Sequence, residues 1–200
     1  MATQVAPRTA LPRWRNGLVA LLPLAAALLV SAPARAQEPA VEFMKTASRE
    51  LIAAAKTGNP QDFIEVIQKR GHVPAIGLYA LGNYKNALQP SDRSTYYGGM
   101  VRFISRYAAN EAPKYDVSHA EIFSPPVREG TNLFVDSRVH LKSGTSYDVR
   151  WLLVPQGNSF RIRDAQVLTF WMSPFLKSLF EDYIGQNGGN PQALVIALNR

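Results

Sequence analysis

Apolar side chains recur every three to four residues in the segment that follows residue 40, and this spacing predicts amphipathic helices. The first helix is predicted over residues 41–57, and Gly58 ends it. Asn59 and Pro60 then predict the start of a second helix, because asparagine caps helix N-termini and proline suits the first helical position. This second helix should end near Gly71.

Two more helices are predicted before the period changes. The third covers roughly 73–87, and the fourth, which has the clearest period, begins at Pro90 and ends at Pro113. Gly98 and Gly99 lie inside the fourth helix, where each glycine costs about 1 kcal/mol relative to alanine. We expect close approach by another element as the compensation, with direct contact to a ligand as the alternative.

Apolar and polar residues then alternate with a period of two, which predicts β-strands. Leu133, Val135, Val139 and Leu141, for example, alternate with polar and charged residues except at Phe134. Short glycine-containing connections predict an antiparallel meander. Four strands are predicted, over residues 114–124, 131–142, 145–155 and 159–169.

Two helices end the chain, and they begin at Ser173-Pro174 and Asn190-Pro191. Helices, then a sheet, then helices is the order of an α+β fold and not of alternating parallel βαβ units. We therefore expect one antiparallel sheet of about four strands, packed on amphipathic helices from both ends of the chain. Six helices around so small a sheet leave room for an internal apolar pocket.

The N-terminal segment has the pattern of a secretory signal peptide. Three arginines precede an apolar run at 18–30, which is too short to span a bilayer comfortably, and a small-x-small motif ends at Ala36. The sequence thus predicts a cleaved signal peptide at 1–36 and a single domain at 37–200, with an uncleaved membrane anchor as the alternative. Export of an unfolded chain to the bacterial periplasm is the expected route.

Charge and cysteine content narrow the class of protein. Without residues 1–36, the chain has 18 basic and 15 acidic residues, a net charge of +3. No run of lysine and arginine tracks a phosphate backbone, so we expect no nucleic-acid partner. The small positive excess is compatible with transient contact with anionic lipid headgroups. The chain has no cysteine, which excludes thiol catalysis and disulfides.

Motifs of catalysis and metal binding are absent from the sequence. The three histidines, His72, His119 and His140, have no metal-ligand spacing, and we interpret His119 and His140 as a cross-strand surface pair. There is no nucleophile elbow, no P-loop and no dinucleotide fingerprint. We therefore predict neither a metal nor a cofactor.

Asp164 is the one acid that stands out. Strict alternation would place it on the same side of its strand as Phe160 and Ile162, where a carboxylate needs a partner or has a raised pKa. Such an acid can serve as a general base in a small cone-shaped α+β enzyme. The preferred interpretation is structural, with the carboxylate bonded to backbone or to arginine near the sheet edge.

Several local motifs occur in an order that carries more information than any one of them. They are Leu81-Gly82-Asn83-Tyr84, the aromatic-rich helix Ser91–Ala109 with Phe103 and Tyr107, Arg163-Asp164-Ala165, Phe180, Gly188-Gly189 and a final helix with Leu194 and Leu198. In this order the chain resembles the MlaC-type periplasmic lipid-binding proteins, the toluene-tolerance family of ABC-transporter auxiliary proteins, over nearly all of 40–200. It departs from the family where Leu168-Thr169-Phe170-Trp171 replace a Glu-Gly-x-Ser turn.

The resemblance implies a strongly bent sheet that encloses a cavity for acyl chains, with the headgroup at the mouth. It implies a monomeric carrier, not an enzyme, that takes a lipid, phospholipid first, between an outer-membrane lipoprotein and porin complex and an inner-membrane ABC transporter. A hopanoid or another apolar ligand is the alternative cargo. A small enzyme that uses Asp164 as base, or a structural envelope protein with a solid core, is the alternative class.

The candidate lipid-binding residues come from the helices and strands that would surround the pocket. A shift of one residue in strand register would turn the chosen strand positions to the opposite face. The candidates are Tyr79, Tyr84, Tyr97, Met100, Val101, Ile104, Tyr107, Val139, Val149, Trp151, Val167 and Trp171.

Overall fold

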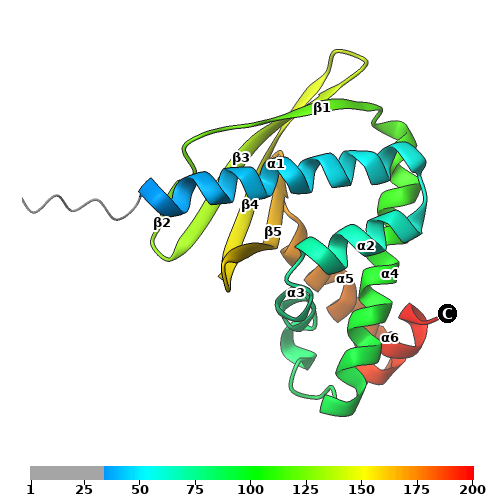
Figure 1. The fold of residues 1–200 in the computed structure, drawn as a ribbon. Helices are drawn as coiled ribbons and strands as arrows, with labels where there is room; N and C mark the ends of the chain where they lie inside the picture. Colours follow the sequence, from blue (N-terminus) through cyan, green and yellow to red (C-terminus); the bar gives the residue numbers. More distant parts are fainter. Residues whose placement is uncertain (1–33) are drawn as a thin grey trace, which may run out of the picture. The chain divides into compact units, whose positions relative to one another are not determined.

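Helices from both ends of the chain pack against one antiparallel sheet, in the order that the periodicity predicts (Figure 1). The computed structural model describes residues 34–200, and most of the predicted signal peptide lies outside this part. The helices are α1 (Ala34–Thr57), α2 (Pro60–Arg70), α3 (Val73–Ala80), α4 (Arg93–Glu111), α5 (Met172–Gln186) and α6 (Pro191–Leu198). The strands are β1 (Val117–Ile122), β2 (Val127–Glu129), β3 (Asn132–Leu141), β4 (Ser146–Gln156), β5 (Ser159–Val167) and β6 (Phe170–Trp171).

The sheet has the strand order β1-β3-β4-β5-β6, and β2 also pairs with β3. Every pairing is antiparallel. The predicted α+β class and the antiparallel meander are therefore confirmed. The prediction of about four strands was short by two, because β2 and β6 have three and two residues and show no period of their own. Among residues 34–200, no helix combines the length and apolar content needed to cross a membrane.

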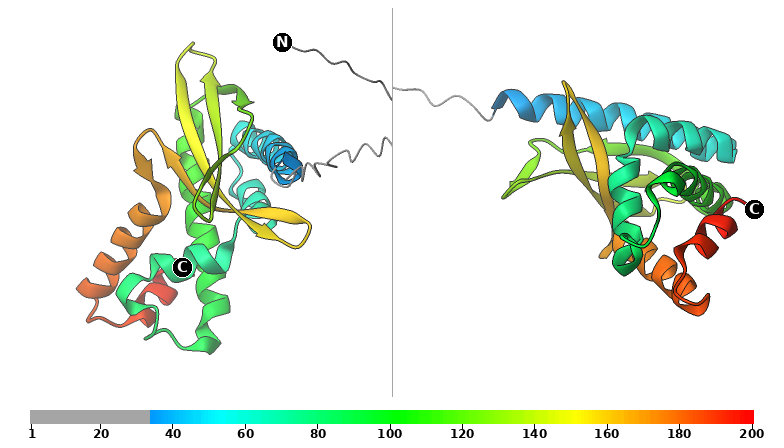
Figure 2. Two further views of the ribbon diagram at one scale, coloured as in Figure 1. Left: turned by 90° about the vertical axis from the view of Figure 1, so that its left-hand side faces the viewer. Right: turned by 90° about the horizontal axis from the view of Figure 1, so that it is seen from below.

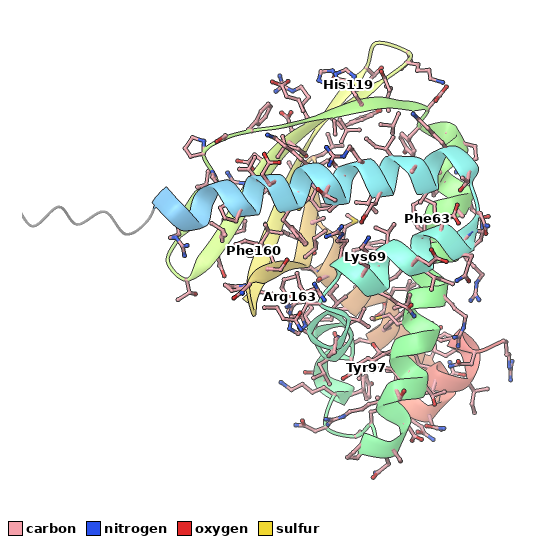
Figure 3. All side chains as sticks on the ribbon, in the orientation of Figure 1. Phe63, Lys69, Tyr97, His119, Phe160 and Arg163 are labelled. Atoms are coloured by element: carbon pink, nitrogen blue, oxygen red, sulfur yellow. The ribbon has the colours of Figure 1, made fainter. Side chains whose placement is uncertain are left out.

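One hydrophobic core joins α1 to the sheet. Leu133, Val135 and Leu153 are buried on one sheet face, together with the apolar side of α1. Phe160, which Figure 3 labels, lies at the start of β5 and packs against Phe43 of α1 with ring centroids 6.1 Å apart. This face is buried because alternate positions of β3 and β4 are apolar and the register aligns them.

A second core lies among the helices α3, α4, α5 and α6. Phe180 of α5 lies near its centre, between the rings of Tyr96 and Phe103 at 6.3 and 5.8 Å. The hydroxyl of Tyr96 donates a hydrogen bond of 2.9 Å to the carbonyl of Gly77, so this buried polar group is satisfied. In the right-hand view of Figure 2, β5 runs from the side of α1 toward α5 and so joins the two cores.

The third helix is shorter than predicted. The prediction of helix over 73–87 is wrong beyond Ala80, because Gly82 adopts a left-handed conformation with φ of +51° that a right-handed helix cannot contain. A 3₁₀ turn follows, and the N–H of Asn83 donates a 2.7 Å hydrogen bond to the carboxylate of Glu181 on α5. The Leu-Gly step thus ends α3 and ties it to α5.

Gly99 allows α4 and α6 to approach closely. A Cβ at this position would lie 2.8 Å from the Cβ of Leu198 and 2.7 Å from the side-chain nitrogen of Asn199. The expected explanation, close approach by another element, is therefore confirmed for Gly99. Gly98 has more room, since its nearest neighbour would be Arg102 at 3.4 Å.

An ion pair between α1 and α2 should make stability depend on pH. Arg70 donates two hydrogen bonds of 2.7 Å to the carboxylate of Glu50, and Lys69 donates a third of the same length. The hydrogen bonds from Arg70 hold the pKa of Glu50 at about 2, below its usual 4.5. A carboxyl whose pKa is depressed on folding stabilises the fold above the unfolded pKa, and that contribution is lost as pH falls from about 4.5 toward 2.

We expect Glu50→Gln to lower the free energy of unfolding at pH 7 by about 1–2 kcal/mol. The difference from the unmodified protein should shrink as pH falls through the same window. Urea denaturation at pH 7, 4 and 2.5 measures it. Glu42→Gln is the matched control, because Glu42 lies on the same helix in an exposed pair with Lys45 and should change stability by less than about 0.5 kcal/mol. Equal losses for both variants would contradict this account.

Candidate functional site

The predicted strand residues of the site share one face of the sheet. Val139 belongs to the same face of β3 as Ser137, and Ser137 pairs with Val149. Val149 in turn pairs with Val167 on β5, and Trp151 lies two residues further along the same face of β4. This is also the face that packs against α1 through its other half. The structure therefore brings together Val139, Val149, Trp151 and Val167.

A small polar group lies among these apolar residues. The indole N–H of Trp151 donates a 2.9 Å hydrogen bond to the hydroxyl of Ser137, which donates to the carbonyl of Val149 at 3.2 Å. Ser137 is buried, and both of its bonds remain within the sheet. The orientation of the Trp151 ring is thus fixed by β3, and its apolar surface is available for packing.

The predicted helical residues form a second group. Met100 is buried in the helical core, and Tyr84, Tyr97 and Ile104 pack partly buried against that core. Val101 is buried on α4. Tyr97 lies far from His119 of β1 (Figure 3). These residues therefore contribute to packing between helices.

Two of the predicted tyrosines are largely exposed. The side chain of Tyr107, on α4, is 57% exposed, and that of Tyr79, on α3, is 41% exposed. The guanidinium of Arg163 lies over the Tyr79 ring at 5.2 Å, which is a cation–π contact. Tyr79 is thus held at the junction of α3 and β5.

Trp171 is separated from the other predicted strand residues. It pairs with Gln166, whose own partner on β4 is Arg150, and this places Trp171 on the opposite sheet face from Trp151. There it packs on Phe134 with ring centroids 6.1 Å apart. The structure therefore does not bring Trp171 together with Val149 and Val167.

Beyond Phe134, Leu152 and Val154, that opposite face is polar. Arg150 forms ion pairs with Asp136 and Glu129 at 2.8 and 2.9 Å, and Arg138 pairs with Asp148 at 2.7 Å. His119 and His140 are cross-strand partners whose rings stack 4.5 Å apart, which confirms the interpretation of a cross-strand pair. This network is typical of the solvent-facing side of an antiparallel sheet.

Asp164 lies on the other side of its strand from the position that strict alternation predicts, so that expectation is wrong. Leu153 pairs with Ile162 and Leu152 with Asp164, so Arg163 is an extra residue in β5 and reverses the alternation. The carboxylate of Asp164 accepts hydrogen bonds from the N–H of Ala165 at 2.8 Å and of Ser173 at 2.9 Å. Ser173 lies in the first turn of α5, which has no side-chain hydrogen bond from its own N-cap residue. Asp164 therefore caps α5 from a neighbouring strand.

A set of large apolar side chains that the sequence reasoning did not assign to the site is exposed between β5 and the middle of α5. Each is between 40% and 69% exposed. The signal for them was the apolar segment Leu168-Thr169-Phe170-Trp171, which stands where the family that the sequence resembles has a polar turn. We refer to the set as the exposed apolar patch; its members are Leu168, Phe170, Met172, Phe175 and Leu179.

A surface groove lies along α1, and Ala120, which lines it, is the cross-strand partner of Val139. It has a volume of about 510 Å³, is open to solvent and runs between α1 and β1. Arg49, Lys56 and His119 line it together with Ile52 and Ile122. None of the predicted lipid-binding residues contributes to this groove.

The fold resembles that of a solved lipid-binding protein. A phospholipid-binding protein from Ralstonia solanacearum, solved in complex with a phospholipid, superposes on this chain with a TM-score of 0.61. The two chains are 20% identical, and the match covers 80% of this chain and 94% of the other. No protein-family model matches the sequence, and neither does any curated protein. The similarity establishes a shared α+β fold.

Proposed function

We propose that this protein binds a phospholipid and carries it between membranes. The observation that carries the proposal is the match, over nearly the whole of the solved chain, to the fold of a phospholipid-binding protein. The apolar face formed by Val139, Val149, Trp151 and Val167 supports it, because acyl chains need such a surface. A hopanoid or another apolar lipid is the second candidate for the cargo.

The route that we propose runs through the periplasm, between an outer-membrane complex and an inner-membrane ABC transporter. The signal-peptide pattern at 1–36 and the order of the family-like motifs support this location and these partners. The hydrogen bonds of Asp164 to backbone N–H groups of Ala165 and Ser173 favour a structural role for the residue over catalysis. The proposed carrier therefore transports its lipid without chemically modifying it.

Physical chemistry limits how such a carrier could release its lipid. At about 0.8 kcal/mol per buried CH₂, two chains of about 16 carbons each would gain roughly 20 kcal/mol or more before costs. This is near the ceiling of non-covalent affinity, so spontaneous release would be slow. A partner that favours an altered conformation of the protein is needed for unloading.

Native mass spectrometry and solvent extraction of the purified protein test the proposal directly. We expect a mass shift equal to one phospholipid and the same lipid in the extract. A polycyclic lipid in the extract would identify the second candidate instead. Protein that is lipid-free and takes up no labelled phospholipid would contradict lipid binding altogether.

Substitutions that fill the site should reduce loading. Ile104 and Val139 are only partly buried, so a tryptophan at either position has solvent-accessible space on one side. Displacing about two CH₂ groups of the lipid costs about 1.6 kcal/mol, which is roughly a tenfold loss of affinity. We expect Ile104→Trp and Val139→Trp to lower uptake of labelled phospholipid by about this factor.

Ile196→Trp provides the matched control, because Ile196 is an exposed apolar residue on α6, outside both groups of predicted residues. Its uptake should equal that of the unmodified protein. Circular dichroism shows whether each variant keeps its fold. Unchanged uptake by folded Ile104→Trp and Val139→Trp would remove these two residues from the site.

A further inference from the structure

The exposed apolar patch is unusual in its composition. It gathers five large apolar side chains within the twelve residues 168–179, each between 40% and 69% exposed. Scattered exposed apolar residues are ordinary on a protein surface, whereas a contiguous set marks a site of interaction. No acidic residue occurs between 165 and 180, and Lys177, the one charged residue there, is paired with Glu181 at 2.7 Å. The patch is therefore apolar and carries almost no net charge.

Leu168 occupies a backbone conformation that does not suit leucine. It lies in the two-residue turn between β5 and β6 with φ of +57°, where glycine or asparagine is accommodated with less strain. Its side chain is 60% exposed, so the leucine gains little from burial within the fold. A bulky apolar group is thus held at the tip of a turn at some cost to stability.

The helix that follows continues the same surface. Met172, Phe175 and Leu179 recur at three- and four-residue steps and are exposed, whereas Leu176 and Phe180 are buried in the helical core. Phe170 pairs with Val167, which belongs to the sheet face that carries the predicted lipid-binding strand residues. The patch is therefore continuous with the site through the β5–β6 hairpin.

We propose that the exposed apolar patch inserts shallowly into a phospholipid bilayer when the protein exchanges its lipid. This inference rests on the proposed function, since it names how the site reaches a membrane. Leucine, methionine and phenylalanine side chains without paired acids suit the boundary between headgroups and acyl chains. A bilayer is the favoured occupant over a protein partner, because the patch offers no unpaired charge that would select one. Continuity with the site gives the cargo a path from the bilayer to the protein.

Flotation of the purified protein with phosphatidylcholine vesicles, in parallel with vesicles that contain one quarter phosphatidylglycerol, tests the inference. We expect the unmodified protein to float with both, with little dependence on salt, because apolar contacts and not charge drive the binding. The double variant Leu168→Asn, Phe175→Ser should float at least about tenfold less. Asparagine tolerates the left-handed turn at residue 168, so the hairpin is retained. Ile196→Ser is the matched control and should float like the unmodified protein.

Five outcomes decide between this inference and its alternatives. Failure of the unmodified protein to float, or equal flotation of the double variant, overturns the inference. Self-association of a protein that does not float, measured by light scattering, assigns the patch to a second copy and overturns it also. Loss of extracted lipid with flotation unchanged makes the patch part of the lipid site, which overturns membrane contact but not the proposed function. Flotation of a protein that carries no lipid retains membrane contact and removes the proposed function.

Discussion

Phe180→Ala should lower the free energy of unfolding by about 3–5 kcal/mol, the largest effect that we expect from one substitution in this chain. Phe180 is buried, and its ring meets those of Tyr96 and Phe103 edge to face. The smaller side chain would leave a cavity that α3, α4 and α6 fill only in part, because they are held against one another by further contacts. Chemical denaturation followed by circular dichroism measures the loss.

We also expect Phe180→Ala to reduce binding of phospholipid. α5 carries both Phe180 and the exposed apolar residues Phe175 and Leu179, so a loosened core would also loosen the surface beside the site. Leu179→Ala, on the same helix, is the control: its side chain is 41% exposed, so the loss should be less than about 1 kcal/mol. If Phe180→Ala and Leu179→Ala cost the same, the packing of Phe180 in the second core does not stabilise the fold.

Asp164→Ala should cost about 2–3 kcal/mol, because the N–H groups of Ala165 and Ser173 would lose their acceptor and α5 its cap. Ser173 is buried, so water replaces the carboxylate poorly. Asp164→Asn retains an oxygen at the same place and should cost less than about 1 kcal/mol. Thermal and urea denaturation of the two variants measure the difference.

The same pair of variants separates a structural acid from a catalytic base. A structural Asp164 predicts that Asp164→Asn binds phospholipid like the unmodified protein, whereas Asp164→Ala is less stable but loads once folded. An enzyme that used Asp164 as its base would lose turnover in Asp164→Asn while its stability hardly changed. A stable Asp164→Asn protein that has lost a measurable activity would therefore overturn the structural role of this carboxylate.

The elements that the sequence predicted correctly were those with strong local signals. Asn59-Pro60 and Asn190-Pro191 begin α2 and α6 because the asparagine side chain accepts an N–H in the first turn of each helix. The helical period of α4 and the alternation in β3 and β4 arise because one side of each element is more buried than the other. The positions of apolar residues along the sequence are enough to show this. Prediction from local signals failed where an element was too short to show a period, as in β2. It also failed at Gly82, whose left-handed conformation is incompatible with a continuing helix.

The candidate site was predicted in part, for a related reason. Alternation placed Val139, Val149 and Trp151 on one face, because no irregularity interrupts their register. Val167 shares this face only because of the bulge at Arg163. A hydrophobic period does not reveal the bulge at Arg163 or the turn at Leu168. These two features determine the sheet face on which Asp164 and Trp171 lie. The exposure of Phe175 could not be read from α5, whose apolar positions cover more of its surface than the helical core can bury.

The sequence by itself determined the class of fold, the order of the helices and strands, and the alternation of the long strands, because each depends on a period or a cap within one segment. The tertiary structure alone decided which of the apolar side chains are buried, that Asp164 caps α5, and that the five side chains of the exposed apolar patch remain exposed. These outcomes depend on contacts between segments far apart in the chain, and on bulges that add a residue to one strand and not to its partner. Whether a side chain is buried depends on the residues that pack around it, and most of those residues are distant in the sequence.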